Sequence, residues 1–164
     1  MAAASAFPFA EVAMESTVRC RRRPRRRPCP GFLRLVRHAY EEAIEWSCPS
    51  CGDGGVVRGW RGLLGDLSEA HLPEKEAREA GPPLCLYLTE EQHAAMMRLP
   101  GLDPIAWRLV MGAIRTEEGI ALAGTAPELL RLALPLAVAL ARNRTGRHRE
   151  PLLAVHEALT AILG

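Results

Sequence analysis

Apolar and polar residues alternate in short runs over the first third of the chain, the pattern of β-strands rather than of helices. Phe32–Arg37 is rich in β-favouring residues and follows the turn signal Pro30-Gly31. In residues 44–48, apolar and polar side chains alternate strictly, which is the period of a half-buried strand. Two further short strands are predicted over residues 17–20 and 56–60. The pattern therefore predicts a four-stranded β unit over residues 17–62.

From residue 84 onward the apolar spacing becomes mainly helical, with clear helix-start signals. Thr89 with Gln92 and Thr125 with Glu128 have the spacing of capping boxes, and Asp103 precedes a proline at the first helical position. The predicted elements are strands over 84–88 and 119–123 and helices over 89–99, 103–115, 125–143 and 151–164, the third helix being kinked at Pro135. We therefore predict an α+β protein whose second part, residues 84–164, is a small, mostly helical β-α-α-β-α-α domain.

The remaining segments are expected to connect or flank these two parts. Residues 1–16 are Ala-rich and are expected to form a disordered tail, with Met14 as an alternative start. Residues 63–83 contain three prolines and a charged stretch, which predict a linker with a short helical turn near Pro73 to Ala80. No secretory signal pattern opens the chain, and the longest apolar run has ten residues, whereas a spanning helix needs about 20. We expect a cytoplasmic protein outside the membrane.

Four of the five cysteines have a spacing that indicates a metal site. Cys48-Pro-Ser-Cys51-Gly52 is a zinc-knuckle pattern, in which two thiolates on one tight turn reach the same tetrahedral Zn²⁺. Cys20 and Cys29 supply a second pair and would lie at the two feet of an eight-residue loop. We predict one structural Zn²⁺ per chain on Cys20, Cys29, Cys48 and Cys51. Four thiolates leave no open position for catalysis.

Other interpretations of the cysteines stay open at this point. In one of them, Cys20 and Cys29 are unrelated thiols and only the Cys48–Cys51 pair serves as ligands. A redox CxxC motif would want a helix after it to lower a thiol pKa, and the glycines and valines that follow Cys51 instead predict a turn and a strand. Cys85 lies within an apolar strand, where a core position is the simplest interpretation.

Positive charge is concentrated between the first two predicted ligands. Residues 19–61 hold eleven arginines and four acids, a formal charge of +7 against +2 for the whole chain. Such asymmetry is typical of segments that bind polyanions, and guanidinium groups pair with phosphates through two hydrogen bonds. Trp46, Trp60 and Phe32 offer aromatic faces nearby for unpaired bases. The candidate nucleic-acid-binding residues are Arg21, Arg22, Arg23, Arg25, Arg26, Arg27, Arg58 and Trp60.

Alternative roles for these residues also stay open. The arginine segment can be a solvated loop that offsets the negative charge of a thiolate-rich metal centre, or it can pair with acids of the linker. The two tryptophans have the size and apolarity of core residues.

The cysteine and arginine segments together resemble a known group of proteins. The segments that carry the likeness are Arg19-Cys-Arg-Arg-Arg-Pro24, Arg27-Pro-Cys-Pro-Gly31 and the run from Glu45 to Trp60 that contains CPSCGDGG. They are similar to a group of short, functionally uncharacterised bacterial proteins with an N-terminal zinc-ribbon-like segment and a helical C-terminal half. The resemblance implies the same two-part fold and the same four metal ligands, and it implies no activity.

Two functions from different classes follow from these patterns. The first is a structural-zinc protein that binds nucleic acid through the arginine-rich loop. The alternative is a protein-interaction or accessory module, with zinc as scaffold and the apolar C-terminal helices as the surface for a partner or for self-association. Enzymatic activity is not expected, because no HExxH motif and no phosphate-binding glycine loop with lysine occurs. No small-molecule substrate is indicated.

Overall fold

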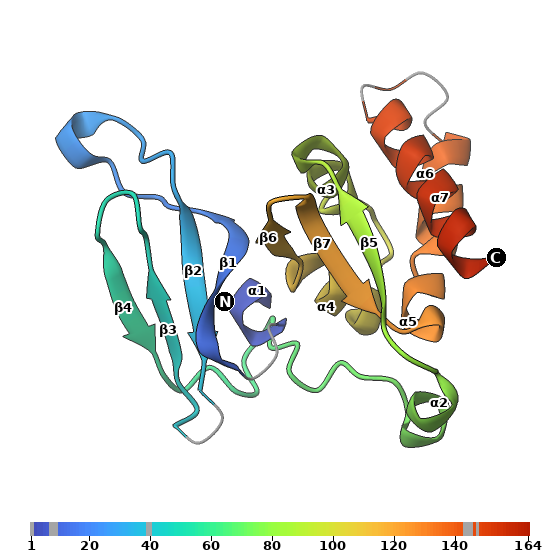
Figure 1. Cartoon of the computed structure of the whole chain (residues 1–164), viewed down its shortest axis with the longest axis horizontal. Coiled ribbons are helices and arrows are strands. Elements are labelled where there is room, and N and C mark those ends of the chain that lie inside the picture. Colours follow the sequence, from blue (N-terminus) through green and yellow to red (C-terminus); the bar gives the residue numbers. More distant parts are fainter. Residues whose placement is uncertain (1, 7–9, 39–40, 143–145, 147) are drawn as a thin grey trace.

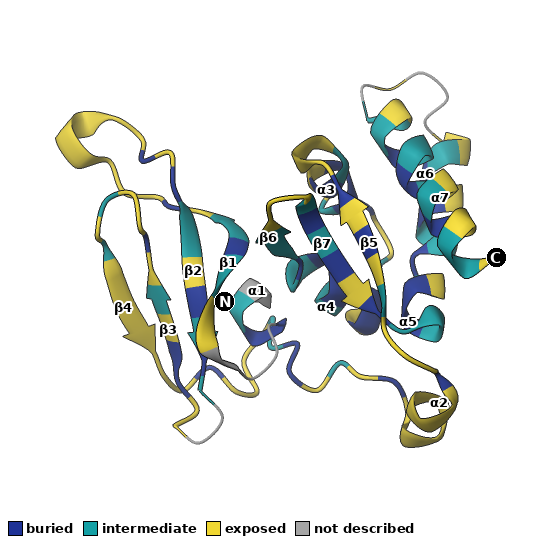
Figure 2. Ribbon diagram, viewed as in Figure 1, coloured by how far each residue is buried: buried dark blue, intermediate teal, exposed yellow. Residues whose placement is uncertain are grey.

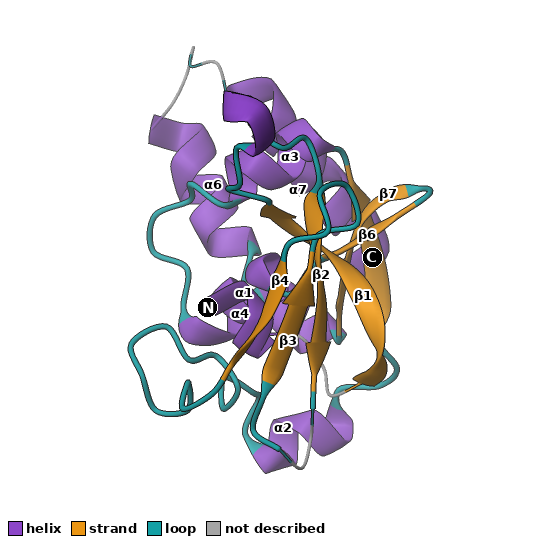
Figure 3. Cartoon of the chain, turned by 90° about the vertical axis from the view of Figure 1, so that its left-hand side faces the viewer, coloured by secondary structure: helices purple, strands orange, loops and turns teal. Residues whose placement is uncertain are grey.

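The two predicted parts of the chain share one sheet in the computed structural model, which describes residues 2–6, 10–38, 41–142, 146 and 148–164. Seven antiparallel strands follow one another in the order β4-β3-β2-β1-β6-β7-β5. Figures 1 and 3 show the first four strands at one end of the molecule and helices α3 to α7 at the other. An α+β fold is confirmed at this level, whereas the more detailed layout predicted for the two parts is not.

The N-terminal strands form two hairpins joined side by side. They are β1 (Ala10–Arg19), β2 (Phe32–Arg37), β3 (Ile44–Ser47) and β4 (Gly54–Val57). Arg34 pairs with Ser47 and Ile44 pairs with Val57, so the four strands form a continuous antiparallel meander. The hairpin ends that carry the cysteines therefore lie together at one end of this four-stranded sheet, as Figure 1 allows the reader to follow.

The expectation of a disordered tail over residues 1–16 does not hold for the described residues 2–6 and 10–16, which form regular structure. Helix α1 (Ala2–Ala6) buries the Ser5 side chain, whose hydroxyl accepts a hydrogen bond from the Leu67 N–H at 3.0 Å. Arg37 on β2 donates to the Ser5 carbonyl at 2.8 Å. Strand β1 also begins at Ala10, seven residues earlier than predicted. The N-terminal residues are held because the sheet and the 63–70 segment supply partners that local sequence does not reveal.

The C-terminal part contains one strand and one helix more than predicted. Its elements are β5 (Leu84–Leu88), α3 (Glu90–Met96), α4 (Pro104–Met111), β6 (Ile114–Thr116), β7 (Gly119–Gly124), α5 (Ala126–Leu130), α6 (Ala133–Arg142) and α7 (Arg149–Leu163). The described order is therefore β-α-α-β-β-α-α-α. The main apolar core, which includes Leu86, Leu122, Leu136 and Val155, lies between this half of the sheet and the helices. Figure 2 shows buried positions, in dark blue, along β5 and β7 and on the helices beside them.

The helix predicted over residues 125–143 is broken before the expected kink. Helix α5 ends at Leu130 and α6 begins at Ala133, so Pro135 stands in the first turn of α6. A proline there costs no hydrogen bond, because the first N–H groups of a helix have no partner inside it. The break separates two helices that both pack on α7.

The predicted start signals of the other helices are confirmed. The Thr89 N–H donates to Gln92 Oε1 at 2.8 Å, and the Ala106 N–H donates to Asp103 Oδ1 at 2.8 Å. In the 63–83 segment, α2 (Glu74–Glu79) matches the predicted short helical turn. Within the described residues, no helix is both long and apolar enough to cross a bilayer.

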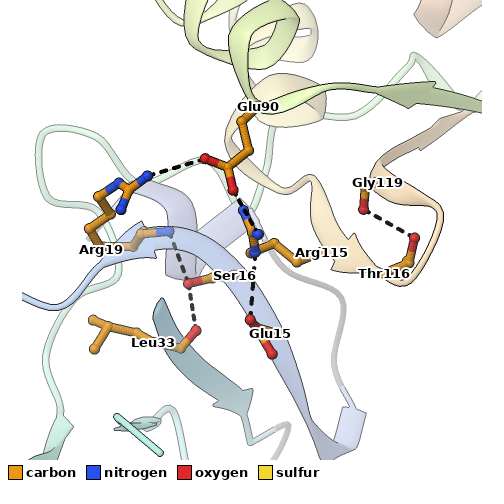
Figure 4. A network of polar contacts seen from close by, with 9 residues as sticks. Glu15, Ser16, Arg19, Leu33, Glu90, Arg115, Thr116 and Gly119 are labelled. Carbon is orange, nitrogen blue, oxygen red and sulfur yellow. Dashed lines mark hydrogen bonds and ion pairs between the residues drawn. The ribbon is translucent and has the colours of Figure 1, made fainter. Parts of the chain in front are cut away.

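Strands β1 and β6 join the two halves of the sheet through one pair of residues, Ser16 and Ile114, and a polar network surrounds this junction. Arg115 contacts Glu90 at 2.9 Å and Glu15 at 3.5 Å, as Figure 4 shows. Its guanidinium also lies 3.8 Å from the centroid of the Phe32 ring. Arg115 therefore ties the C-terminal half to both β1 and β2.

Candidate metal centre and arginine loop

The four predicted ligands converge at one end of the N-terminal sheet because each stands at the end of a strand. Cys20 follows β1 and Cys48 follows β3, while Cys29 and Cys51 shortly precede β2 and β4. In an antiparallel meander these four positions are neighbours. All four sulfurs lie within 4.8 Å of one another. The predicted convergence of the two cysteine pairs is confirmed.

The sulfur spacing fits a single tetrahedral metal ion. Cys20 Sγ lies 3.7 Å from Cys51 Sγ, and Cys29 Sγ lies 3.7 Å from Cys48 Sγ. Four sulfurs at about 2.3 Å from a central ion would be about 3.8 Å apart. A disulfide would need about 2.05 Å, and all four thiols are free. The cluster can therefore hold a metal ion with one ligand from each strand end.

Backbone N–H groups point at the sulfurs and prepare them for negative charge. The Gly31 N–H donates to Cys29 Sγ at 3.5 Å. Burial raises the pKa of Cys48, but the N–H groups of Cys51 and Ser50 and the neighbouring thiols lower it to about 7. The turn after Cys48 thus stabilises a thiolate near neutral pH, the form that binds metal.

The four thiols cannot all ionise without a counter-ion. The Arg22 N–H lowers the pKa of Cys20, yet burial and the three neighbouring thiols raise it, to about 12. Burial and the thiols of Cys48 and Cys51 likewise raise the pKa of Cys29 against the effect of the Gly31 N–H. A divalent cation at the centre would replace these protons, so metal binding and thiol ionisation are coupled.

Two glycines are required at this cysteine cluster, each for a different reason. A Cβ atom at Gly31 would stand 2.5 Å from Ser50 Oγ and 2.8 Å from Cys48 Sγ. Gly52 has a φ of 72°, the left-handed conformation that glycine adopts without steric cost, and no atom lies within 4 Å of its Cβ position. Gly31 is therefore needed for space and Gly52 for backbone conformation.

The arginine segment forms a loop whose two feet are fixed at the metal centre. The Cys20 N–H donates to the Gly31 carbonyl at 2.8 Å and the Cys29 N–H to the Arg22 carbonyl at 2.9 Å. All residues from 21 to 28 are exposed, as Figure 2 shows at the upper left. Arg25 and Arg26, at the tip, have φ values of 52° and 66°. The loop therefore joins two of the four clustered cysteines.

Most of the loop's charge is available to a partner. Arg22 pairs with Asp53 on the knuckle turn at 3.1 Å, which links the two hairpins. Among the residues that the structure describes, no acid contacts the guanidinium groups of Arg21, Arg23, Arg25, Arg26 or Arg27. Pairing of these side chains with the acids of the linker is therefore not found in the described part of the chain.

Two of the predicted nucleic-acid-binding residues do not lie at this loop. Trp60 is only 1% exposed, and its Nε1 donates to the Glu42 carbonyl at 2.6 Å. The guanidinium of Arg37 lies 5.0 Å from its ring centroid, so the indole has no free face for a base. Arg58 follows β4 at the opposite end of the sheet and pairs with Glu41 at 3.4 Å. Trp60 and Arg58 therefore do not lie beside the loop, and the Trp60 ring is covered.

The tryptophan that lies beside the arginine loop is Trp46. The sequence does not distinguish Trp46 from Trp60. Trp46 is half-buried and pairs with Leu35 on one side and Gly55 on the other. Its side chain lines a groove of about 490 Å³ that also includes Arg21 and Arg22. Alternation along β3 assigns Trp46 to one of the two faces of the strand. Only the assembled structure shows that the groove beside the loop lies on this face.

Comparison of the chain with models of protein families, with curated proteins and with solved structures finds no match in any of the three.

Proposed function

We propose that the four cysteines bind one structural Zn²⁺, which holds a basic loop in position to bind nucleic acid. Zinc is the metal that most often takes four thiolates in a tetrahedron. The 3.7 Å sulfur contacts support this choice. Because four thiolates fill the coordination shell, the ion would act as scaffold and not as catalyst.

The observation that carries the nucleic-acid proposal is the exposed loop of six arginines with both ends tied to the metal centre. Such a loop presents its charges without the entropy loss of ordering a free tail. Guanidinium groups match phosphates in geometry and stay charged at every physiological pH. A hollow of about 380 Å³ lies between the loop and the knuckle turn and is lined by Arg22, Arg23 and Asp53. It offers room for an anion beside two guanidinium groups.

The proposal is tested by the salt dependence of binding. Each phosphate contact on a single strand contributes about −0.7 to the slope of log K against log salt concentration, so six contacts predict a slope near −4. The double variant Arg25→Asn/Arg26→Asn removes two charges, while asparagine still tolerates the left-handed backbone at these positions. We expect its slope to be smaller in magnitude by about 1.4.

A matched control removes two arginines elsewhere. Arg58→Asn/Arg78→Asn has the same net charge, and both side chains pair with acids away from the loop. This control should keep the wild-type slope. Binding that hardly changes with salt, or equal effects of the two double variants, would refute the loop as the binding element.

A second candidate function is a protein-interaction module that uses the helical half. It is favoured by Leu130 and Leu134, which are 59% and 72% exposed at the junction of α5 and α6. If the surface joins two copies of the chain, light scattering should give twice the monomer mass, and Leu134→Glu should give a monomer. A wild-type monomer would argue against self-association through this surface.

A further inference from the structure

The open face of the N-terminal sheet has an unusual combination of side chains. Leu35, Trp46 and Gly55 lie opposite one another across three strands, and Ile44 pairs with Val57 two residues further along. Side-chain alternation puts these residues on one face of the sheet. Leu35, Trp46, Ile44 and Val57 line the groove of about 490 Å³ described above, and Ala4 of α1 also lines it. Leu35 and Ile44 are 4% and 1% exposed, whereas Trp46 is half-buried and Val57 is 36% exposed, so the groove opens at Trp46 and Val57.

The opposite face of the same strands is mixed. Arg34, Glu45 and Ser47 are exposed there, and Val36 and Val56 share that face. The groove face differs in carrying the indole of Trp46 beside the arginine loop. An apolar face left open in this way is typical of a binding surface.

The groove becomes basic toward the metal centre. Arg19, Arg21 and Arg22 line this end, with Asp53 as the acid among the lining residues. Glu90 contacts Arg19 at 3.2 Å and Asp53 contacts Arg22 at 3.1 Å, whereas Arg21 has no acidic partner in the described part of the chain. The groove is thus apolar at its floor, where the Trp46 indole lies, and positively charged at the end that Arg21 lines. A ligand that matches it has a flat, weakly polar ring and an anionic group.

We infer that this groove binds an unpaired base of a single-stranded nucleic acid, packed against Trp46, with its backbone directed onto Arg21 and the arginine loop. The inference rests on the proposed function and specifies its substrate. A base within a duplex is stacked between its neighbours and cannot enter a groove in the sheet. Aromatic side chains beside a basic surface are how proteins hold single strands without sequence preference.

The test compares two probes that carry the same phosphates. One is oligo(dT) of about twelve nucleotides, a length within the usual site size, and the other is an abasic strand of equal length. We expect the wild-type chain to bind oligo(dT) about tenfold more tightly, the effect of one stacked base. Trp46→Leu should bring the ratio of the two affinities close to one, and Trp46→Phe should keep most of it.

Two valines on β4 supply a matched pair of variants. Val57 lines the groove and is 36% exposed, while Val56 points to the opposite face and is 54% exposed. Val57→Glu places a negative charge in the groove and should weaken oligo(dT) binding several-fold. Val56→Glu adds the same charge one residue away, on the other face, and should leave the ratio of the affinities for the two probes unchanged.

The outcomes separate this inference from the proposed function. If the wild-type chain binds both probes equally tightly and with a steep salt dependence, the loop binds phosphates and the base groove is wrong. If it binds neither probe at low salt, both the groove and the nucleic-acid function are wrong. Because the comparison of probes uses the wild-type chain, it remains decisive even if a Trp46 variant fails to fold.

Discussion

A single methyl group at Gly31 is expected to impair the metal centre. Ordinary contacts to a Cβ atom begin at 3.4 Å, so an alanine here would be 0.9 Å too close to Ser50 Oγ and 0.6 Å too close to Cys48 Sγ. The Ser50 hydroxyl is exposed and can rotate away, but Ser50 Cβ, at 2.8 Å, moves only with the backbone. Cys48 Sγ cannot move when it ligates a metal, so the strain of Gly31→Ala counts against the metal-bound form.

The size of the effect follows from the cost of forcing extra volume into a packed site. Overpacking of this kind typically costs about 1–3 kcal/mol. If the strain is released when the thiols separate without metal, metal affinity falls roughly 5- to 150-fold. Ser50→Gly in the Gly31→Ala background removes two of the three close contacts and should recover part of the loss.

Competition with a chromophoric chelator under reducing conditions measures this affinity directly. Gly52→Ala serves as the comparison, because no atom lies within 4 Å of that Cβ position and only the φ of 72° is unfavourable. The backbone strain of Gly52→Ala should cost about 1–2 kcal/mol. Gly52→Asn should cost less, because asparagine tolerates this conformation. If Gly31→Ala binds zinc as tightly as the wild type, the two hairpins do not meet at a metal as described.

Two further predictions concern the stability of the fold. Burial lowers the pKa of His93, whose Nε2 lies 2.8 Å from the Val110 carbonyl, so protonation favours the unfolded chain and stability falls as pH drops below about 6.5. Urea unfolding at about pH 7.5 and 5.5 should show this loss in the wild type and less of it in His93→Gln; equal losses would contradict it. Arg115→Met removes the stacking on Phe32 and the ion pairs at the junction of the sheet, and should lower the free energy of unfolding by about 1–2 kcal/mol. Arg78→Met, which removes one exposed pair on α2, should cost less than about 0.5 kcal/mol, and an equal cost would refute the role given to Arg115.

Local sequence signals predicted those elements whose cause is local. Phe32–Arg37 was delimited by a turn signal and by β-favouring residues, and the capping residues Thr89 and Asp103 marked two helix starts. The clustering of the four cysteines was predictable because cysteine spacing and strand alternation together bring the hairpin ends to one end of the sheet. The turn and capping signals depend on residues only a few positions apart.

Features set by long-range packing were missed. Strand β6 has three residues and exists because it bridges β1 and β7, so no periodic pattern announces it. Trp46 and Trp60 carry the same local signal, but contacts with Glu42 and Arg37 bury only Trp60. In the same way, the tail prediction failed because the partners of the Ser5 hydroxyl lie about 60 residues further along the chain.

Metal content of the reduced, purified chain, combined with hydrogen exchange before and after removal of the metal, tests the central claim most directly. The account predicts one zinc per chain, held until a strong chelator is added. Its removal should abolish amide protection at the cysteine ends of β2 and β3, where the buried cluster consists of the cysteines with Leu33 packed against them, while the helical core around Leu136 and Val155 keeps its protection. Reduced protein that contains no metal and still protects the amides of β2 and β3 would contradict the account.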